Sequence, residues 1–95
     1  MKILWTKPAD QQLSFACDFV ASDNPSAADK LHSQIVEQVQ QLAEYPLAGR
    51  TGRVSDTREL VIAGTPYVVA YRITFKSEIQ ILAVLHGKRR WPVAF

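Results

Sequence analysis

The order of apolar and polar residues predicts helices in the first half of the chain and strands in the second. Residues 2–6 read KILWT, a short stretch rich in strand-favouring residues, and predict a first strand. Apolar residues then recur at helical spacing from Ala9 to Val20, and again from Ala28 to Leu42. The boundary is marked by Asn24 and Pro25, a helix-capping residue followed by a first-turn proline. We therefore expect two amphipathic helices near residues 9–22 and 25–44, paired as a helical hairpin.

Two aromatic residues in the first helix do not follow its apolar stripe. Phe15 and Phe19 fall on nearly the opposite side from Leu13 and Ala16. They indicate either a wide buried face, two incidentally exposed aromatics, or a surface that contacts a partner.

Three strand-forming segments follow in residues 58–62, 67–73 and 79–86, with short turns between them, and predict an antiparallel meander. Strict alternation places Ile79, Ile81, Ala83 and Leu85 on one face of the last strand, opposite Gln80, Leu82, Val84 and His86. The last two strands are apolar on both faces, so each face needs a cover. The helical hairpin covers one face, and a loop or a partner covers the other. The predicted fold is α+β, ordered β-α-α-β-β-β, with an antiparallel sheet.

Length and composition limit the classes of protein that fit. Ninety-five residues, of which 47% are hydrophobic, predict one folded domain over residues 1–95. The single cysteine, Cys17, excludes an intramolecular disulfide and fits a reducing, cytoplasmic location. We expect neither a signal peptide nor a membrane span, because no apolar run is long enough.

Charge is unevenly distributed between the two halves. Residues 1–45 carry three lysines against six acidic residues, a net charge of −3, whereas residues 46–95 carry eight basic against three acidic residues, a net charge of +5. A basic half indicates either an anionic partner or an ordinary solvated surface.

Candidate chemistry is confined to arginines and one histidine. Histidine, cysteine and acidic residues lack metal-ligand spacing, and no glycine-rich nucleotide motif is present, so we predict no metal and no cofactor. Arg58 and Arg72 lie among apolar strand residues, where each needs either a carboxylate partner (Glu59, Asp56 or Glu78) or an anionic ligand. His86 either simply ends a strand or acts as a general acid or base on a ribose phosphate.

These segments together resemble the RelE/ParE superfamily of toxins from bacterial type II toxin–antitoxin modules. The resemblance rests on NP-x-A-A at the second helix start, GRTGR at 49–53, TREL at 57–60, PYVVAYR at 66–72 and ILAVLHGKRRWP at 81–92. It covers nearly the whole chain. It implies a cognate antitoxin as partner, with a hetero-oligomeric complex as one form of the assembly.

The superfamily divides by cellular target. RelE-like members cleave messenger RNA on the ribosome and commonly carry an arginine directly after the tyrosine that opens the third strand, where this chain has Val68 after Tyr67. ParE-like members inhibit DNA gyrase by binding, and the ending from His86 to Pro92 is more similar to theirs. The resemblance therefore favours a ParE-like toxin. The alternatives are a RelE-like endoribonuclease and a non-toxic binding module of the same fold.

Each alternative implies its own site residues. A ParE-like toxin has no catalytic residue, and we expect its target to contact residues of the basic half: Arg50, Arg53, Arg58, Lys88, Arg89, Arg90 and Trp91. A RelE-like nuclease, which needs no metal, would use Arg58, Arg72 and Arg89 to bind phosphate and His86 to transfer protons.

Overall fold

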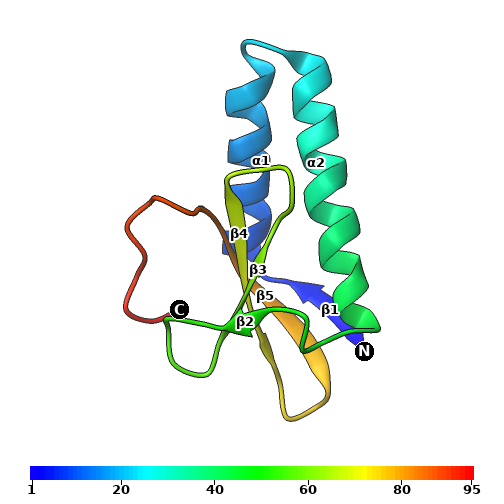
Figure 1. The fold of residues 1–95 in the computed structure, drawn as a ribbon, viewed down its shortest axis with the longest axis vertical. Helices are drawn as coiled ribbons and strands as arrows, with labels where there is room; N and C mark the ends of the chain where they lie inside the picture. Colours follow the sequence, from blue (N-terminus) through cyan, green and yellow to red (C-terminus); the bar gives the residue numbers. More distant parts are fainter.

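The protein is an α+β domain in which a helical hairpin packs on one face of a five-stranded sheet. The computed structural model describes all residues from 1 to 95. Its elements are β1 (Lys2–Trp5), α1 (Lys7–Ala21), α2 (Pro25–Gln40), a short 3-10 helix η1 (Gln41–Ala43), β2 (Arg50–Thr51), β3 (Arg58–Val61), β4 (Tyr67–Ile73) and β5 (Glu78–His86). The two helices lie side by side and extend past the end of the sheet (Figure 1). The predicted order of elements is confirmed.

Both helices begin at residues whose side chains cap them. The Thr6 hydroxyl accepts a hydrogen bond from the backbone N–H of Ala9 at 3.4 Å, and this cap starts α1 two residues earlier than the apolar stripe predicts. The Asn24 side chain accepts from the N–H of Ala27 at 3.1 Å, and Pro25 occupies the first turn of α2 as predicted.

The sheet is mixed rather than wholly antiparallel. Its strand order is β1-β5-β4-β3-β2, and the predicted antiparallel meander of β3, β4 and β5 is confirmed. The prediction of a wholly antiparallel sheet is wrong for the first strand, because β1 pairs with β5 in parallel. The chain between these two strands contains the helical hairpin and β2 to β4, so it is long enough to connect a parallel pair. The loop after α2 also contributes the unpredicted two-residue strand β2, which pairs with β3.

A β-bulge in β5 overturns the predicted alternation of its side chains. Ala70 pairs with Ala83, but the next residue, Tyr71, pairs with Ile81, so Leu82 has no partner on β4. One extra residue reverses the faces of all that follow. Val84 therefore joins Ile81 in the core beneath the helices, and His86 lies on the same side of the sheet as α1.

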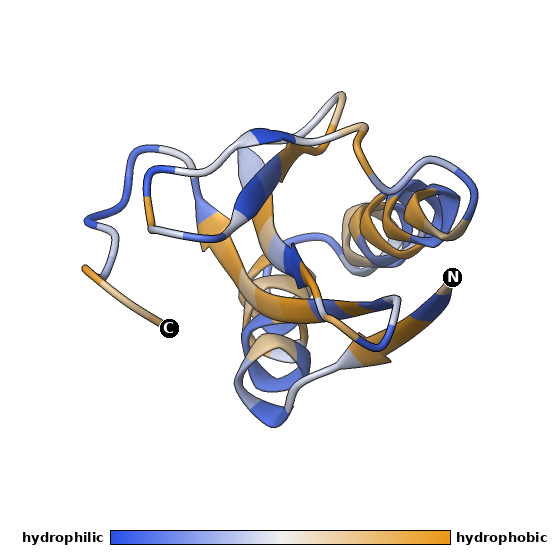
Figure 2. Cartoon of the chain, turned by 90° about the horizontal axis from the view of Figure 1, so that it is seen from below, coloured by the Kyte–Doolittle hydropathy of each residue, from blue (hydrophilic) through white to orange (hydrophobic).

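Apolar side chains fill both faces of the sheet, but unequally. The main core lies between the helical hairpin and the sheet, with Ile35, Val69, Tyr71 and Ile81 fully buried. The second face carries a smaller cluster, hereafter the second-face cluster, formed by Ala70, Leu82, Ala83 and Leu85. Figure 2 shows the apolar colouring concentrated along the central strands, with the C-terminal segment on the far side from α2. No helix has the length and apolar character needed to cross a membrane.

Candidate functional site

The structure distributes the sequence-predicted site residues over three places. The first is a cluster on the second face that contains Arg50, Arg53 and Trp91. A polar cavity at the start of β3 and the end of β4 holds Arg58 and Arg72. The third is a groove beside α1 that holds His86, Lys88 and Arg89, while Arg90 is exposed in the connecting segment.

Glu59 organises the first place. Its side chain is only 2% exposed, and its carboxylate lies 3.0 Å from the guanidinium nitrogens of both Arg50 and Arg53. The backbone N–H of Arg53 also donates to it at 2.8 Å. Burial alone would raise the pKa of the Glu59 carboxyl, but the hydrogen bonds from Arg53 and Arg50 outweigh burial and lower the pKa to about 2. Glu59 therefore remains ionised and fixes the loop arginines to β3.

Arg53 in turn holds the C-terminal segment against the sheet. Its guanidinium carbon lies 3.9 Å from the centroid of the Trp91 ring, a cation–π contact. Trp91 also packs against the second-face cluster. In Figure 1 the C-terminal segment, coloured red, leaves the end of β5 and returns toward β2. The cover predicted for the second face is thus provided in part by the chain's own end.

Arg58 and Arg72 have no carboxylate partner. Both ion pairs of the structure belong to Glu59, so the predicted pairing of Arg58 or Arg72 with an acidic residue does not occur. Arg58 donates from Nη1 to the carbonyl of Gly49 at 2.6 Å. The Nε of Arg72 is buried without a hydrogen-bond partner. The two side chains line a cavity of about 320 Å³ at the end of the sheet.

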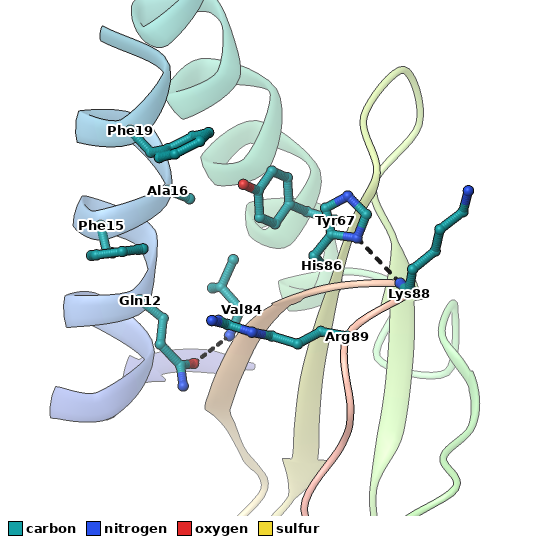
Figure 3. A pocket seen from close by; sticks show the side chains of 9 residues that line it. All are labelled: Gln12, Phe15, Ala16, Phe19, Tyr67, Val84, His86, Lys88 and Arg89. Carbon is teal, nitrogen blue, oxygen red and sulfur yellow. Dashed lines mark hydrogen bonds between the residues drawn. The ribbon is translucent and has the colours of Figure 1, made fainter. Parts of the chain in front are cut away.

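The third place, hereafter the α1 groove, is an open hollow of about 390 Å³ between α1 and the end of β5. Its lining combines aromatic, small and basic side chains: Gln12, Phe15, Ala16, Phe19, Tyr67, Val84, His86, Lys88 and Arg89 (Figure 3). Phe15 and Phe19 are 65% and 70% exposed, which excludes the wide buried face as the reason for their position off the stripe.

His86 is oriented by two neighbours in this groove. Its ring meets the Tyr67 ring edge-on, with centroids 5.8 Å apart and planes at 72°. The backbone N–H of Lys88 donates to its Nδ1 at 3.2 Å, so the hydrogen-bonded form has Nδ1 unprotonated. Sequence reasoning missed Tyr67 as a site residue, because strand alternation gives no sign that a core-facing tyrosine reaches a groove.

The residues of the RelE-like alternative do not form one site. Arg58 and Arg72 line the polar cavity, whereas His86 and Arg89 line the α1 groove. Arg58 pairs with Tyr71 and His86 with Tyr67, so their partners are four positions apart on β4, about 13 Å along the strand. Histidine, cysteine and acidic side chains nowhere form a group of three or more able to hold a metal ion.

Comparison with known proteins identifies the family. The family model described as the ParE toxin of the type II toxin–antitoxin system parDE matches residues 3–91. The chain belongs to the ParE toxin family. Its relatives include the curated protein "Putative toxin Y4kP" of Sinorhizobium fredii, 41% identical over 96% of this chain and 93% of the relative. "Toxin RelE2" of Caulobacter vibrioides is 30% identical over 93% of this chain and 97% of its own length.

A solved structure supports the same assignment. A chain described as the chromosomal ParDE toxin–antitoxin system from P. aeruginosa superposes with a TM-score of 0.82 at 31% identity, covering 90% of this chain and 95% of the other. The resemblance read from the sequence is therefore confirmed at the level of the superfamily, of the ParE family and of the fold.

Proposed function

We propose that this ParE-family toxin inhibits DNA gyrase by binding it, and that a cognate antitoxin neutralises the toxin. Binding rather than catalysis is supported by the separation of Arg58 and Arg72 from His86 and Arg89, which leaves no single site holding phosphate ligands and a proton-transfer group together. Gyrase acts in the cytoplasm, which is accordingly the proposed place of action.

The observation that carries this proposal is the construction of the C-terminal end, whose residues 88–91 we call the basic segment. Lys88, Arg89 and Arg90 are exposed, so three cations face solvent directly after a central strand. Trp91 is half-buried and fixed by Arg53 and the second-face cluster. A basic surface anchored by an aromatic residue is suited to contact with an acidic protein surface or with DNA held by an enzyme.

A supercoiling assay with purified gyrase tests the proposal. The triple variant Lys88→Glu/Arg89→Glu/Arg90→Glu should lose inhibition, because contact with the target is removed. His86→Gln should retain it, because no proton transfer is involved. Lys76→Glu, on the exposed turn between β4 and β5, is the matched charge control and should also inhibit. Inhibition that survives the triple reversal would refute the role of the basic segment.

A RelE-like ribonuclease is the second candidate function. It is favoured by the 30% identical relative named "Toxin RelE2" and by the unpartnered Nε of Arg72, which lies with Arg58 in a cavity that Asp56 also lines. On this alternative, ribosome-dependent RNA cleavage should be measurable and should fall roughly 10²–10⁴-fold in His86→Gln. Cleavage of RNA together with failure to inhibit gyrase would replace our proposal. Absence of both activities, and of growth inhibition on expression, would indicate a non-toxic binding module.

A further inference from the structure

The chain after β5 depends on Trp91 for its attachment to the domain. Its last hydrogen bonds are donated by the backbone N–H groups of Lys88 and Arg89 to His86. Residues 90–95 form neither a hydrogen bond nor an ion pair, and even the buried indole N–H of Trp91 lacks a partner. In Figure 1 these residues follow an open path beside the sheet. Contacts of the Trp91 ring therefore determine whether this segment is held in one position.

Arg53 contacts the Trp91 ring with a face of its guanidinium group. Nε and Nη2 of Arg53 donate to the two carboxylate oxygens of Glu59 at 3.0 and 3.1 Å, and its backbone N–H donates to Glu59 at 2.8 Å. The donors of a guanidinium group lie in its plane, so this pairing uses one edge and leaves the faces free. The Cζ atom of Arg53 lies 3.9 Å from the centroid of the Trp91 ring, which is too close for an edge-on contact. Arg53 therefore connects the buried carboxylate of β3 to the C-terminal segment.

Arg50 binds the same carboxylate without reaching this segment. Its Nε and Nη2 donate to one oxygen of Glu59 at 3.3 and 3.0 Å, whereas the cation–π contact with Trp91 belongs to Arg53 alone. The two arginines thus share the ion pair with Glu59 and differ in their contact with Trp91. A lysine at either position would retain the positive charge, but an ammonium group has no planar face and no fork of donors. Substitution by lysine therefore separates the geometry of each arginine from its charge.

We infer that Arg53 is a positioning residue of the toxin: bound through its edge to Glu59 and through its face to Trp91, it fixes the basic segment in the orientation that the target binds. This inference rests on the proposed function, in which the cations of the basic segment contact gyrase. It differs from the expectation that Arg53 itself contacts the target. A segment that is already ordered loses less conformational entropy on binding, so fixing it strengthens inhibition without adding a contact.

Nuclear magnetic resonance of the two tryptophan indole N–H groups tests whether Arg53 fixes the segment. Trp5 packs against the main core and serves as the internal reference for an intact fold. In Arg53→Lys, nitrogen relaxation of the Trp91 indole should change from that of a rigid group to that of a flexible one, while Trp5 remains rigid. Arg50→Lys is the matched control and should leave both indoles rigid. A rigid Trp91 in Arg53→Lys, or equal mobility in the two lysine variants, would overturn the inference.

A supercoiling assay with purified gyrase tests the consequence for inhibition. Arg53→Lys should inhibit roughly 3- to 30-fold more weakly than wild type, the equivalent of one lost cation–π contact. Lys76→Arg, an exchange of one cation on the exposed turn between β4 and β5, is the control and should inhibit as wild type does. Full inhibition by Arg53→Lys, or weaker inhibition although Trp91 stays rigid, would show that Arg53 does not act by positioning. If wild type does not inhibit gyrase, the proposed function fails, whereas the relaxation of Trp91 still decides whether Arg53 fixes the segment.

Discussion

Replacement of Glu59 by glutamine should destabilise the toxin and remove a pH dependence of its stability. Glutamine retains the volume of the side chain but removes the charge that faces Arg50 and Arg53. The pKa of Glu59 falls from 4.5 to about 2 on folding, and each pKa unit is equivalent to about 1.36 kcal/mol, so its interactions contribute about 3 kcal/mol at neutral pH. The arginine side chains are 57% and 44% exposed, and screening by water reduces the expected loss to about 2 kcal/mol.

The sign of the pH dependence follows from the lowered pKa. A carboxyl whose folded pKa lies below its unfolded value stabilises the fold fully above pH 4.5, and this contribution is lost as pH falls toward about 2. The difference in unfolding free energy between wild type and Glu59→Gln should therefore shrink between pH 5 and pH 3. Urea unfolding followed by far-ultraviolet circular dichroism measures it at each pH.

Glu37→Gln is the matched control, because Glu37 is exposed on α2 and makes no ion pair. It should change the unfolding free energy by less than about 0.5 kcal/mol at any pH. The reasoning is refuted if Glu59→Gln is as stable as the control at pH 7, or if its deficit is the same at pH 3 as at pH 7.

Two further substitutions test interactions that join distant segments or begin a helix. Tyr71→Phe should cost roughly 1–3 kcal/mol in urea unfolding, because the buried hydroxyl donates to the carbonyl of Pro46 at 2.8 Å and accepts from the N–H of Gly49 at 2.9 Å; an unchanged midpoint would contradict this. Asn24→Ala should lower thermal stability by about 1 kcal/mol through loss of the α2 cap, and Asn24→Asp, which retains an acceptor, should restore it. Equal melting temperatures of the alanine and aspartate variants would show that the cap is dispensable.

The elements themselves could be predicted because their signals are local. The apolar stripes of both helices and the Asn24–Pro25 start depend on neighbours within one or two turns. The early start of α1 also has a local signal, because Thr6 is a capping residue and Pro8 follows in the first turn. The parallel pairing of β1 with β5 was not, because it joins residues far apart in the sequence and no local pattern specifies it.

The choice of charge partners depended on register rather than on residue type. From the sequence alone, an ion pair of Glu59 with Arg58 or Arg72 was as plausible as one with any other arginine. The two-residue strand β2 places Arg50 directly opposite Glu59, and the turn that follows brings Arg53 to the same carboxylate. Arg58 is thereby left to bond a backbone carbonyl, and Arg72 is left unpartnered. The two-residue strand β2, which is too short to predict, therefore determines which arginines bind Glu59.

The α1 groove depends on one extra residue in β5, Leu82, which the alternation of apolar and polar residues does not reveal. With strict alternation, His86 would lie on the second face, on the opposite side of the sheet from α1. The bulge at Leu82 turns Val84 and His86 toward α1 instead, and the chain after His86 then carries Lys88 and Arg89 to the same side. The sequence shows the exposed phenylalanines and the basic end as unrelated features. The bulge brings Phe15, Phe19, Lys88 and Arg89 to one groove, because it turns the end of β5 toward α1.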